Sequence, residues 1–138
     1  MKHQLAKNPN CPPDVLEALS KDEDWCIRYY VADNPRTPQK ALELLAKDEK
    51  CRVRCAVAEN FRTPTKTLEA LAKDGNDYYV AKNLQTPSST LELLAKDSNA
   101  DMRYWIAKNP NTPPKVLEAL AKDEDWLVRT AEQQIKSS

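Results

Sequence analysis

Residues 32–57 read ADNPRTPQKALELLAKDEKCRVRCAV, and residues 6–31 read AKNPNCPPDVLEALSKDEDWCIRYYV. The two stretches match position by position, and further copies begin at Ala58, Ala81 and Ala107. Self-similarity at a fixed period of this length is typical of repeat architectures. The sequence therefore predicts a single repeat domain over residues 1–138, with copies starting near residues 6, 32, 58, 81 and 107 and the third copy shortened by three residues.

Each copy is predicted to form two helices. The first helix follows a Thr-Pro step, as at Thr37-Pro38, where threonine can cap free N–H groups and proline suits the first helical position. Leucines then recur at helical spacing: Leu16 and Leu19, Leu42 and Leu45, Leu68 and Leu71, Leu91 and Leu94, Leu117 and Leu120. One helix pair cannot bury such a stripe alone, so stacked copies are expected to bury it as a continuous core. The fold class is therefore all-α, a solenoid of about five two-helix repeats.

Charged residues recur in the second half of each copy. An aspartate precedes the second helix, and in four copies an arginine follows six residues later. Because stacking brings these positions into register, we expect a structural ladder of Asp–Arg bonds. Its members are Asp22, Arg28, Asp48, Arg54, Asp97, Arg103, Asp123 and Arg129. The shortened copy lacks the Val-Arg pair that the second copy has at Val53-Arg54. One bond of the ladder should therefore be missing there, and the second helix should be short.

An asparagine ends each second helix, at Asn34, Asn60, Asn83 and Asn109, and Asn8 closes a truncated leading copy. Asparagine tolerates the left-handed conformation that terminates helices, and the proline that often follows blocks continuation. These residues are therefore interpreted as helix caps.

The recurring pattern resembles the variant leucine-rich repeat (LRV) family and is also similar to HEAT repeats. In the second copy it is carried by Pro38, Leu42, Leu45, Asp48, Val53, Arg54, Val57 and Asn60. The resemblance covers roughly residues 6–131. It implies a right-handed α-α superhelix, and for LRV members an alternation of α and 3₁₀ helices. Some LRV members carry an N-terminal cysteine cluster that holds an iron–sulfur centre, whereas the cysteines of this chain lie inside the repeats.

A binding surface is expected on the exposed side of the second helices, because repeat proteins bind through what differs between copies. A helical projection places Val53, Ala56, Val57 and Asn60 inward, and Cys51, Arg52, Cys55 and Glu59 outward. The outward positions across the copies hold the candidate partner-binding residues Trp25, Tyr29, Arg52, Tyr78, Tyr104 and Trp126. Aromatic residues of this kind are favoured at interface hot spots. The alternative is that these rings pack between copies, as is expected of Tyr30 and Trp105.

The four cysteines favour no metal site strongly. Cys51 and Cys55 are one helical turn apart, and Cys26 falls on the adjacent second helix, so three thiols could hold zinc or an iron–sulfur cluster. Their spacing forms no close-set ligand motif, and the single histidine is His3. We therefore expect reduced, structural or surface thiols, with no metal or cofactor.

Composition narrows the function. The net charge is zero, which gives no support for a nucleic-acid or membrane partner. The sequence has no glycine-rich phosphate loop, and its single histidine cannot anchor a catalytic triad. The sequence predicts a non-catalytic scaffold that binds a protein or peptide. Two alternatives stay open: a HEAT-like nucleic-acid-binding module using Arg28, Arg52, Arg54 and Arg103, and a purely structural or engineered array. The absence of a signal-like or membrane-spanning apolar stretch leads us to expect a cytoplasmic protein with no membrane contact.

Overall fold

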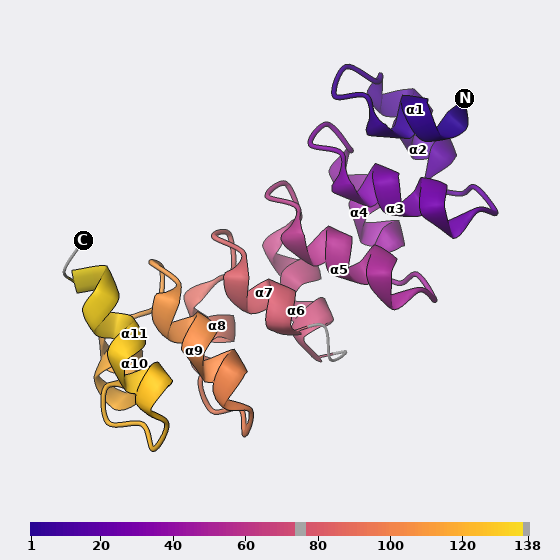
Figure 1. Ribbon diagram of the computed structural model, residues 1–138. Helices are drawn as coiled ribbons and strands as arrows, with labels where there is room; N and C mark the ends of the chain where they lie inside the picture. Colours follow the sequence, from indigo (N-terminus) through magenta and orange to yellow (C-terminus); the bar gives the residue numbers. More distant parts are fainter. Residues whose placement is uncertain (74–76, 137–138) are drawn as a thin grey trace.

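The computed structural model describes residues 1–73 and 77–136 and is helical, with no strand in those residues. A short helix α1 (Lys2–Lys7) is followed by five helix pairs (Figure 1). The first helices of the pairs are α2 (Pro13–Leu19), α4 (Gln39–Leu45), α6 (Thr65–Lys73), α8 (Ser88–Leu94) and α10 (Pro114–Leu120). The second helices are α3 (Trp25–Asp33), α5 (Cys51–Glu59), α7 (Asp77–Lys82), α9 (Ala100–Lys108) and α11 (Trp126–Lys136). Each pair contacts its neighbours along the chain, which is the architecture of an α-solenoid.

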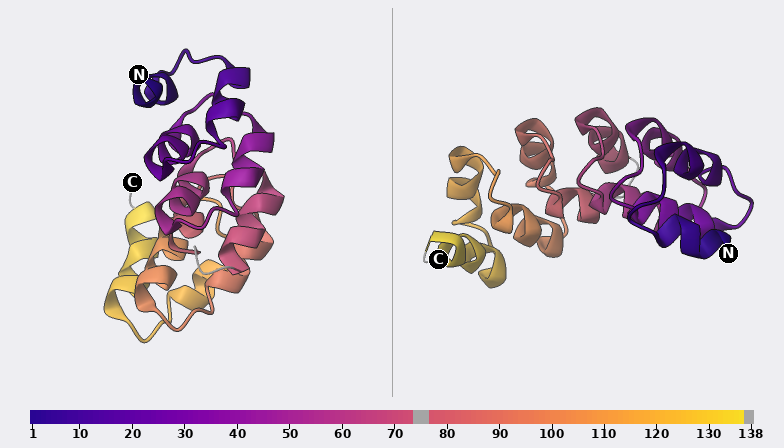
Figure 2. Two further views of the ribbon diagram at one scale, coloured as in Figure 1. Left: turned by 90° about the vertical axis from the view of Figure 1, so that its right-hand side faces the viewer. Right: turned by 90° about the horizontal axis from the view of Figure 1, so that it is seen from above.

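The stack is curved. Helices α1, α3, α5, α7, α9 and α11 pack closely against one another in succession, whereas the first helices of the pairs touch only lightly. In the right-hand view of Figure 2 both ends of the stack bend toward the side of α1 and α11. We therefore call α1 and the second helices the inner helices, their exposed side the concave face, and the first helices the outer helices.

One hydrophobic core runs through the whole stack. It is a single cluster that begins at Ala6 and continues to Ala131. The leucine pairs of the outer helices supply much of it, and of those predicted only Leu117 is half-buried. The inward side of the projection of α5 is confirmed, because Val53, Ala56, Val57 and Asn60 are buried. Of the residues placed outward, Cys51, Arg52 and Glu59 are exposed and Cys55 is half-buried. Each pair is thin, so its leucines are covered by the neighbouring pairs.

The predicted threonine caps are wrong. The Thr63 hydroxyl does not bond to an N–H of the outer helix; it donates to the carbonyl oxygen of Val57 at 2.6 Å, at the end of the preceding inner helix. Equivalent bonds recur in the other copies, from Thr37 to Val31, Thr86 to Val80 and Thr112 to Ile106. The following proline is itself the N-cap in extended conformation, as Pro38 is with φ −66° and ψ 151°. Threonine therefore satisfies an orphan carbonyl at a helix C-terminus instead of an orphan N–H at an N-terminus.

The interpretation of the asparagines as left-handed caps is also wrong. Asn60 has φ −72° and ψ 124°, an extended conformation, and is 7% exposed. Its side-chain Nδ2 donates to the carbonyl oxygens of Ala32 at 2.8 Å and Asn34 at 3.1 Å, both in the preceding copy. Its Oδ1 accepts from the backbone N–H of Arg62 at 2.9 Å. The same contacts are made by Asn34, Asn83 and Asn109. These residues form what we call the asparagine ladder, which ties each copy to the one before it.

Two further expectations concern helix type and length. The resemblance implied alternating α and 3₁₀ helices, but all described helices are α-helices. The second helix of the shortened copy was predicted to be short; its described part, α7, has 6 residues where α5 and α9 have 9, and residues 74–76 before it lie outside the described residues. The predicted missing bond of the Asp–Arg ladder belongs to the same stretch and also falls partly on residues 74–76.

Candidate functional site

The Asp–Arg pairs lie at the turn between the outer and inner helices of successive copies. Arg28 donates from Nε to Asp48 Oδ2 at 2.7 Å and from Nη2 to Asp48 Oδ1 at 3.3 Å. Arg103 binds Asp123 in the same two-pronged way, at 2.7 and 3.0 Å. In the leading copy Lys2 takes the arginine's place and contacts Asp22 at 3.0 Å. Each of these contacts therefore joins one copy to the next.

The same arginines also hold their own copy together. Each donates from Nη1 to the main-chain carbonyl of the aspartate six residues earlier, as Arg54 does to Asp48 at 2.6 Å and Arg129 to Asp123 at 2.7 Å. Arg28 and Arg103 add a bond to the following carbonyl. Asp97 accepts from the N–H of Asn99 at 2.8 Å. The Arg103 hydrogen bond, as the main cause, lowers the pKa of Asp123, while that of Arg103 itself is raised.

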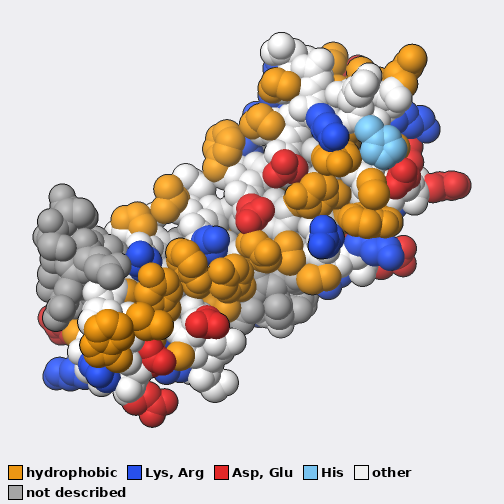
Figure 3. Space-filling model, viewed as in Figure 1, with side chains coloured by type: hydrophobic (Ala, Val, Ile, Leu, Met, Phe, Trp, Pro, Cys, Tyr) orange, Lys and Arg blue, Asp and Glu red, His pale blue; other side chains and the backbone are white. Residues whose placement is uncertain are grey.

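The concave face carries the predicted aromatic residues, but not as one even band. Figure 3 shows hydrophobic side chains running along this face with charged side chains between them. Tyr29 and Tyr104 are half-buried, Tyr78 is 37% exposed and Arg52 is exposed. Trp25 is half-buried against the core, with Lys50 over its ring at 5.9 Å. Trp126 is 64% exposed and lines neither of the two concavities described below.

Two concavities divide this face. The first, of about 360 Å³, lies over α7, α9 and the start of α11 and is lined by Tyr78, Ala100, Asp101, Tyr104, Trp105, Asp125 and Leu127. The second, of about 290 Å³, lies over α3, α5 and α7 and is lined by Tyr29, Arg52, Cys55, Ala56, Glu59 and Tyr79. The structure thus brings Tyr78 together with Tyr104, and Tyr29 together with Arg52.

Sequence reasoning missed the lysines that cover the aromatic rings. Lys82 lies over the ring of Trp105 at 4.5 Å and over that of Tyr78 at 5.3 Å. Lys108 lies over Tyr104 at 5.2 Å, and Lys7 lies over Tyr30 at 4.3 Å. The sequence feature that could have indicated these contacts is a lysine as the last residue of an inner helix. Stacking places such a lysine beside aromatic rings of its own copy or of the next copy. A ring face covered by a cation is already engaged in a favourable contact.

The last residues of the inner helices also set the charge along the concave face. These are Lys7 in α1, Asp33 in α3, Glu59 in α5, Lys82 in α7 and Lys108 in α9. The charge therefore changes from positive to negative and back to positive along the stack. Burial raises the pKa of Asp33, and burial first, then Asp33 and Glu59, raise that of Tyr29. At these five positions the middle of the face is therefore acidic and the ends are basic, while Arg52 lies in the concavity with Glu59, and Asp101 and Asp125 line the other concavity.

The thiols lie on different parts of the molecule. Cys51 and Cys55 approach each other with their Sγ atoms 3.7 Å apart, while Cys11 is buried in the core. Burial, followed by the contact with Cys51, raises the pKa of Cys55 to about 11. Cys26 does not complete a cluster with the other two, and no group of three or more His, Cys, Asp or Glu side chains within the described part of the chain is placed to hold a metal ion.

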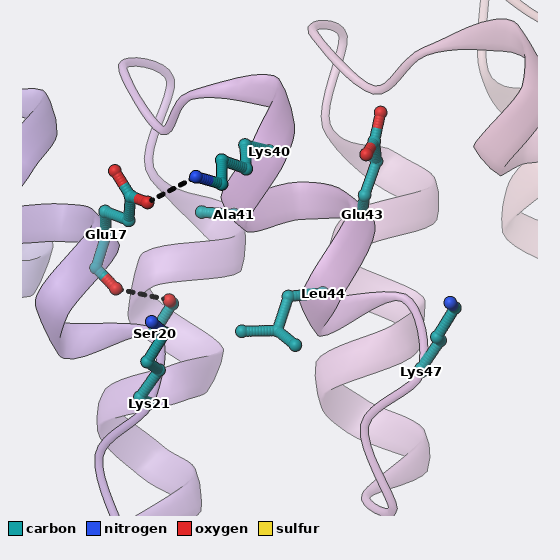
Figure 4. A pocket seen from close by; sticks show the side chains of 8 residues that line it. All are labelled: Glu17, Ser20, Lys21, Lys40, Ala41, Glu43, Leu44 and Lys47. Carbon is teal, nitrogen blue, oxygen red and sulfur yellow. Dashed lines mark hydrogen bonds and ion pairs between the residues drawn. The ribbon is translucent and has the colours of Figure 1, made fainter.

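The outer face has grooves of a different kind. The groove between α2 and α4, of about 340 Å³, is crossed by an ion pair between Glu17 and Lys40 at 3.6 Å, with Leu44 between the helices (Figure 4). Similar grooves with glutamate and lysine walls occur between α4 and α6 and between α8 and α10. Because these grooves repeat with the copies, they offer the same chemistry at each step.

Stacked helix pairs, one continuous core and bonds that join each copy to the next define an α-solenoid repeat protein. No family profile matches the sequence, and no curated protein matches it. A solved structure described as a leucine-rich repeat variant with a novel repetitive structural motif is similar to the chain, with a TM-score of 0.72 and 31% identity over 96% of this chain. The chain therefore has a leucine-rich repeat variant fold. It spans about half of that structure, covering 54% of its length.

Within residues 1–73 and 77–136, none of the helices combines the length and the apolar character needed to cross a lipid bilayer.

Proposed function

We propose that the protein is a non-catalytic scaffold whose concave face binds a protein or peptide in extended conformation. The observation that carries the proposal is the charge order of the residues that end the inner helices: Lys7, Asp33, Glu59, Lys82 and Lys108. Folding does not require equivalent positions of the repeats to differ in charge. Different charges at these positions on one face are therefore better explained by recognition of a partner.

The aromatic residues fit the same role. Tyr78, Tyr104 and Trp105 line one concavity, and Tyr29 and Tyr79 line the other. Tyrosine and tryptophan supply large contact areas with a polar tip, which suits a surface that is wet when free and covered when bound. The lysines over these rings can move to the carboxylates of a partner, because an exposed cation–π contact is worth only about 0.5–1 kcal/mol.

The spacing of the helices suggests the chemistry of the partner. Packed helices lie about 8–10 Å apart, and an extended chain advances about 3.3 Å per residue. One inner helix therefore corresponds to about three residues of an extended peptide. A matching peptide carries basic residues opposite Asp33 and Glu59 and acidic residues opposite Lys82 and Lys108.

Nucleic-acid binding is less well supported. Of the arginines considered for phosphate contacts, Arg28 and Arg103 are bound to Asp48 and Asp123, and Arg54 donates to a main-chain carbonyl. Only Arg52 of the four is exposed on the concave face. Phosphate recognition needs several unpaired cations on one surface.

Selection from a displayed library of random peptides, followed by fluorescence anisotropy, tests the proposal. Enriched peptides should carry a basic centre with acidic residues toward both ends, and Glu59→Lys should weaken their binding at least about tenfold, as expected for the loss and reversal of a charge contact. The matched control is Glu43→Lys on the outer face, which should leave the affinity unchanged. The proposal would be contradicted if the enriched peptides showed no such order of charges, or if Glu59→Lys and Glu43→Lys lost affinity equally.

A further inference from the structure

Cys51 and Cys55 form a pair of thiols on the concave face. Cys51 is the first residue of α5, and Cys55 follows one helical turn later. Their Sγ atoms are 3.7 Å apart, with Cys51 exposed and Cys55 half-buried. Both thiols are free and lie at the surface, so a ligand can reach the pair from solvent.

The distance between the two sulfur atoms favours one kind of cross-link. In a tetrahedral zinc site with Zn–S bonds of about 2.3 Å, two thiolate sulfurs lie about 3.8 Å apart. A disulfide needs an S–S distance of about 2.05 Å, so the sulfurs would have to approach each other by well over an ångström. The observed 3.7 Å separation thus matches two ligands of one ion without rearrangement of α5.

We propose that Cys51 and Cys55 form a two-thiolate site for a thiophilic divalent cation such as Zn²⁺. On binding, each thiol gives its proton to solvent and forms one metal–sulfur bond, with no change of oxidation state. Cysteine thiolates are preferred ligands of such ions, and two of them joined by a rigid helical turn act as a chelate.

The surroundings leave the other coordination positions open. No third His, Cys, Asp or Glu side chain of the described residues completes the site. The concavity lined by Tyr29, Arg52, Cys55, Glu59 and Tyr79 lies beside it, with Glu59 one turn beyond Cys55 on α5. The remaining positions therefore go to water or to a donor group of a second molecule. This inference does not depend on the proposed function.

Titration with Cd²⁺ tests the site, because Cd²⁺ is a spectroscopic substitute for Zn²⁺ whose thiolate bonds give an ultraviolet charge-transfer band. The full chain, reduced with a phosphine that does not compete for the ion, should show one Cd²⁺ bound per chain, and Zn²⁺ should displace it. Cys51→Ser and Cys55→Ser should each weaken binding by about tenfold or more, because the second bond of a chelate forms at high effective concentration.

Two matched variants control for the other thiols. Cys26→Ser and Cys11→Ser should bind Cd²⁺ as the natural chain does, with circular dichroism confirming that every variant is folded. The proposal is overturned if the natural chain gives no charge-transfer band, if Cys51→Ser binds Cd²⁺ as tightly as the natural chain, or if Cys26→Ser removes the band.

Discussion

Asn60 donates a hydrogen bond from its side-chain Nδ2 to the main-chain carbonyl of Asn34 at 3.1 Å, and Asn34 holds the same position one copy earlier. The carbonyl of Ala32, at the end of α3, is the second acceptor of the same amide group. The last carbonyls of a helix have no partner within the helix, and buried carbonyls without a partner are costly. Each copy therefore completes the hydrogen bonding of the copy before it.

Replacement of Asn60 by alanine should destabilise the protein strongly. The change removes both Nδ2 bonds and leaves the N–H of Arg62 without its Oδ1 acceptor. We expect a loss of about 3 kcal/mol in the free energy of unfolding, measured by urea denaturation. Asn60→Asp keeps an acceptor for Arg62 but cannot donate, and it should be at least as destabilising at neutral pH. Exposed Asn10→Ala is the control and should change stability by less than about 0.5 kcal/mol. A small effect of Asn60→Ala would show that the ladder contributes little.

The Arg103–Asp123 contact should make stability depend on pH in acid. The hydrogen bond from Arg103 lowers the pKa of Asp123 below its ordinary value of 3.8. A carboxyl with a lowered folded-state pKa adds stability above its unfolded-state value, and this is lost as the pH falls through the folded-state value. Arg103→Met should therefore cost about 2 kcal/mol at pH 7 and make the acid decline below pH 4 shallower.

The exposed Arg52 offers the matched change for that experiment. Arg52→Met should shift the thermal midpoint by little at either pH, because no contact between copies is removed. If Arg103→Met and Arg52→Met show the same acid profile, the bond between the copies is not what lowers the pKa of Asp123.

Proline should be accepted at position 61. Phe61 is 63% exposed and follows Asn60, as Pro35 follows Asn34 and Pro110 follows Asn109. No described residue accepts a hydrogen bond from the Phe61 N–H. Phe61→Pro should therefore raise the free energy of unfolding by about 0.5 kcal/mol, through a less flexible unfolded chain. Arg62→Pro, one residue later, should be clearly destabilising, because it removes the N–H that Asn60 Oδ1 binds. Equal effects at the two positions would contradict the turn geometry.

The Cys55 thiol should react slowly at neutral pH. Burial and the contact with Cys51 hold its pKa at about 11. Since the thiolate is the reactive form, alkylation of Cys55 should accelerate as the pH rises toward that value. Cys51→Ala removes one of the causes, so the pKa should fall and alkylation at pH 8 should be faster, as measured by peptide-resolved mass spectrometry. An unchanged rate would show that the neighbouring thiol does not affect Cys55.

The repeat period made most of the fold predictable. Helix pairs, the leucine core and the inward side of α5 followed from the spacing of residues such as Leu42, Leu45 and Val53, because periodicity reports which side of a helix is buried. The role of Asn60 did not follow, since an asparagine at a helix end is typical of a cap. Only the stacked copies show that its amide reaches 26 to 28 residues back along the chain.

The candidate site was predictable in part. The outward positions of Tyr29, Tyr78 and Tyr104 followed from the helical projection. The division into two concavities and the contact of Lys82 with Trp105 did not, because they depend on the curvature of the stack and on the short helix α7. Sequence spacing within one copy contains no information on how the next copy is rotated.

Hydrogen–deuterium exchange of the chain with a peptide enriched by library selection tests the binding role of the concave face most directly. We expect slower exchange in the inner helices α5, α7 and α9, which carry Glu59, Lys82 and Lys108. Exchange in the outer helices α4, α6 and α8 should stay as in the free protein. Protection confined to the outer helices would contradict a binding surface on the concave face.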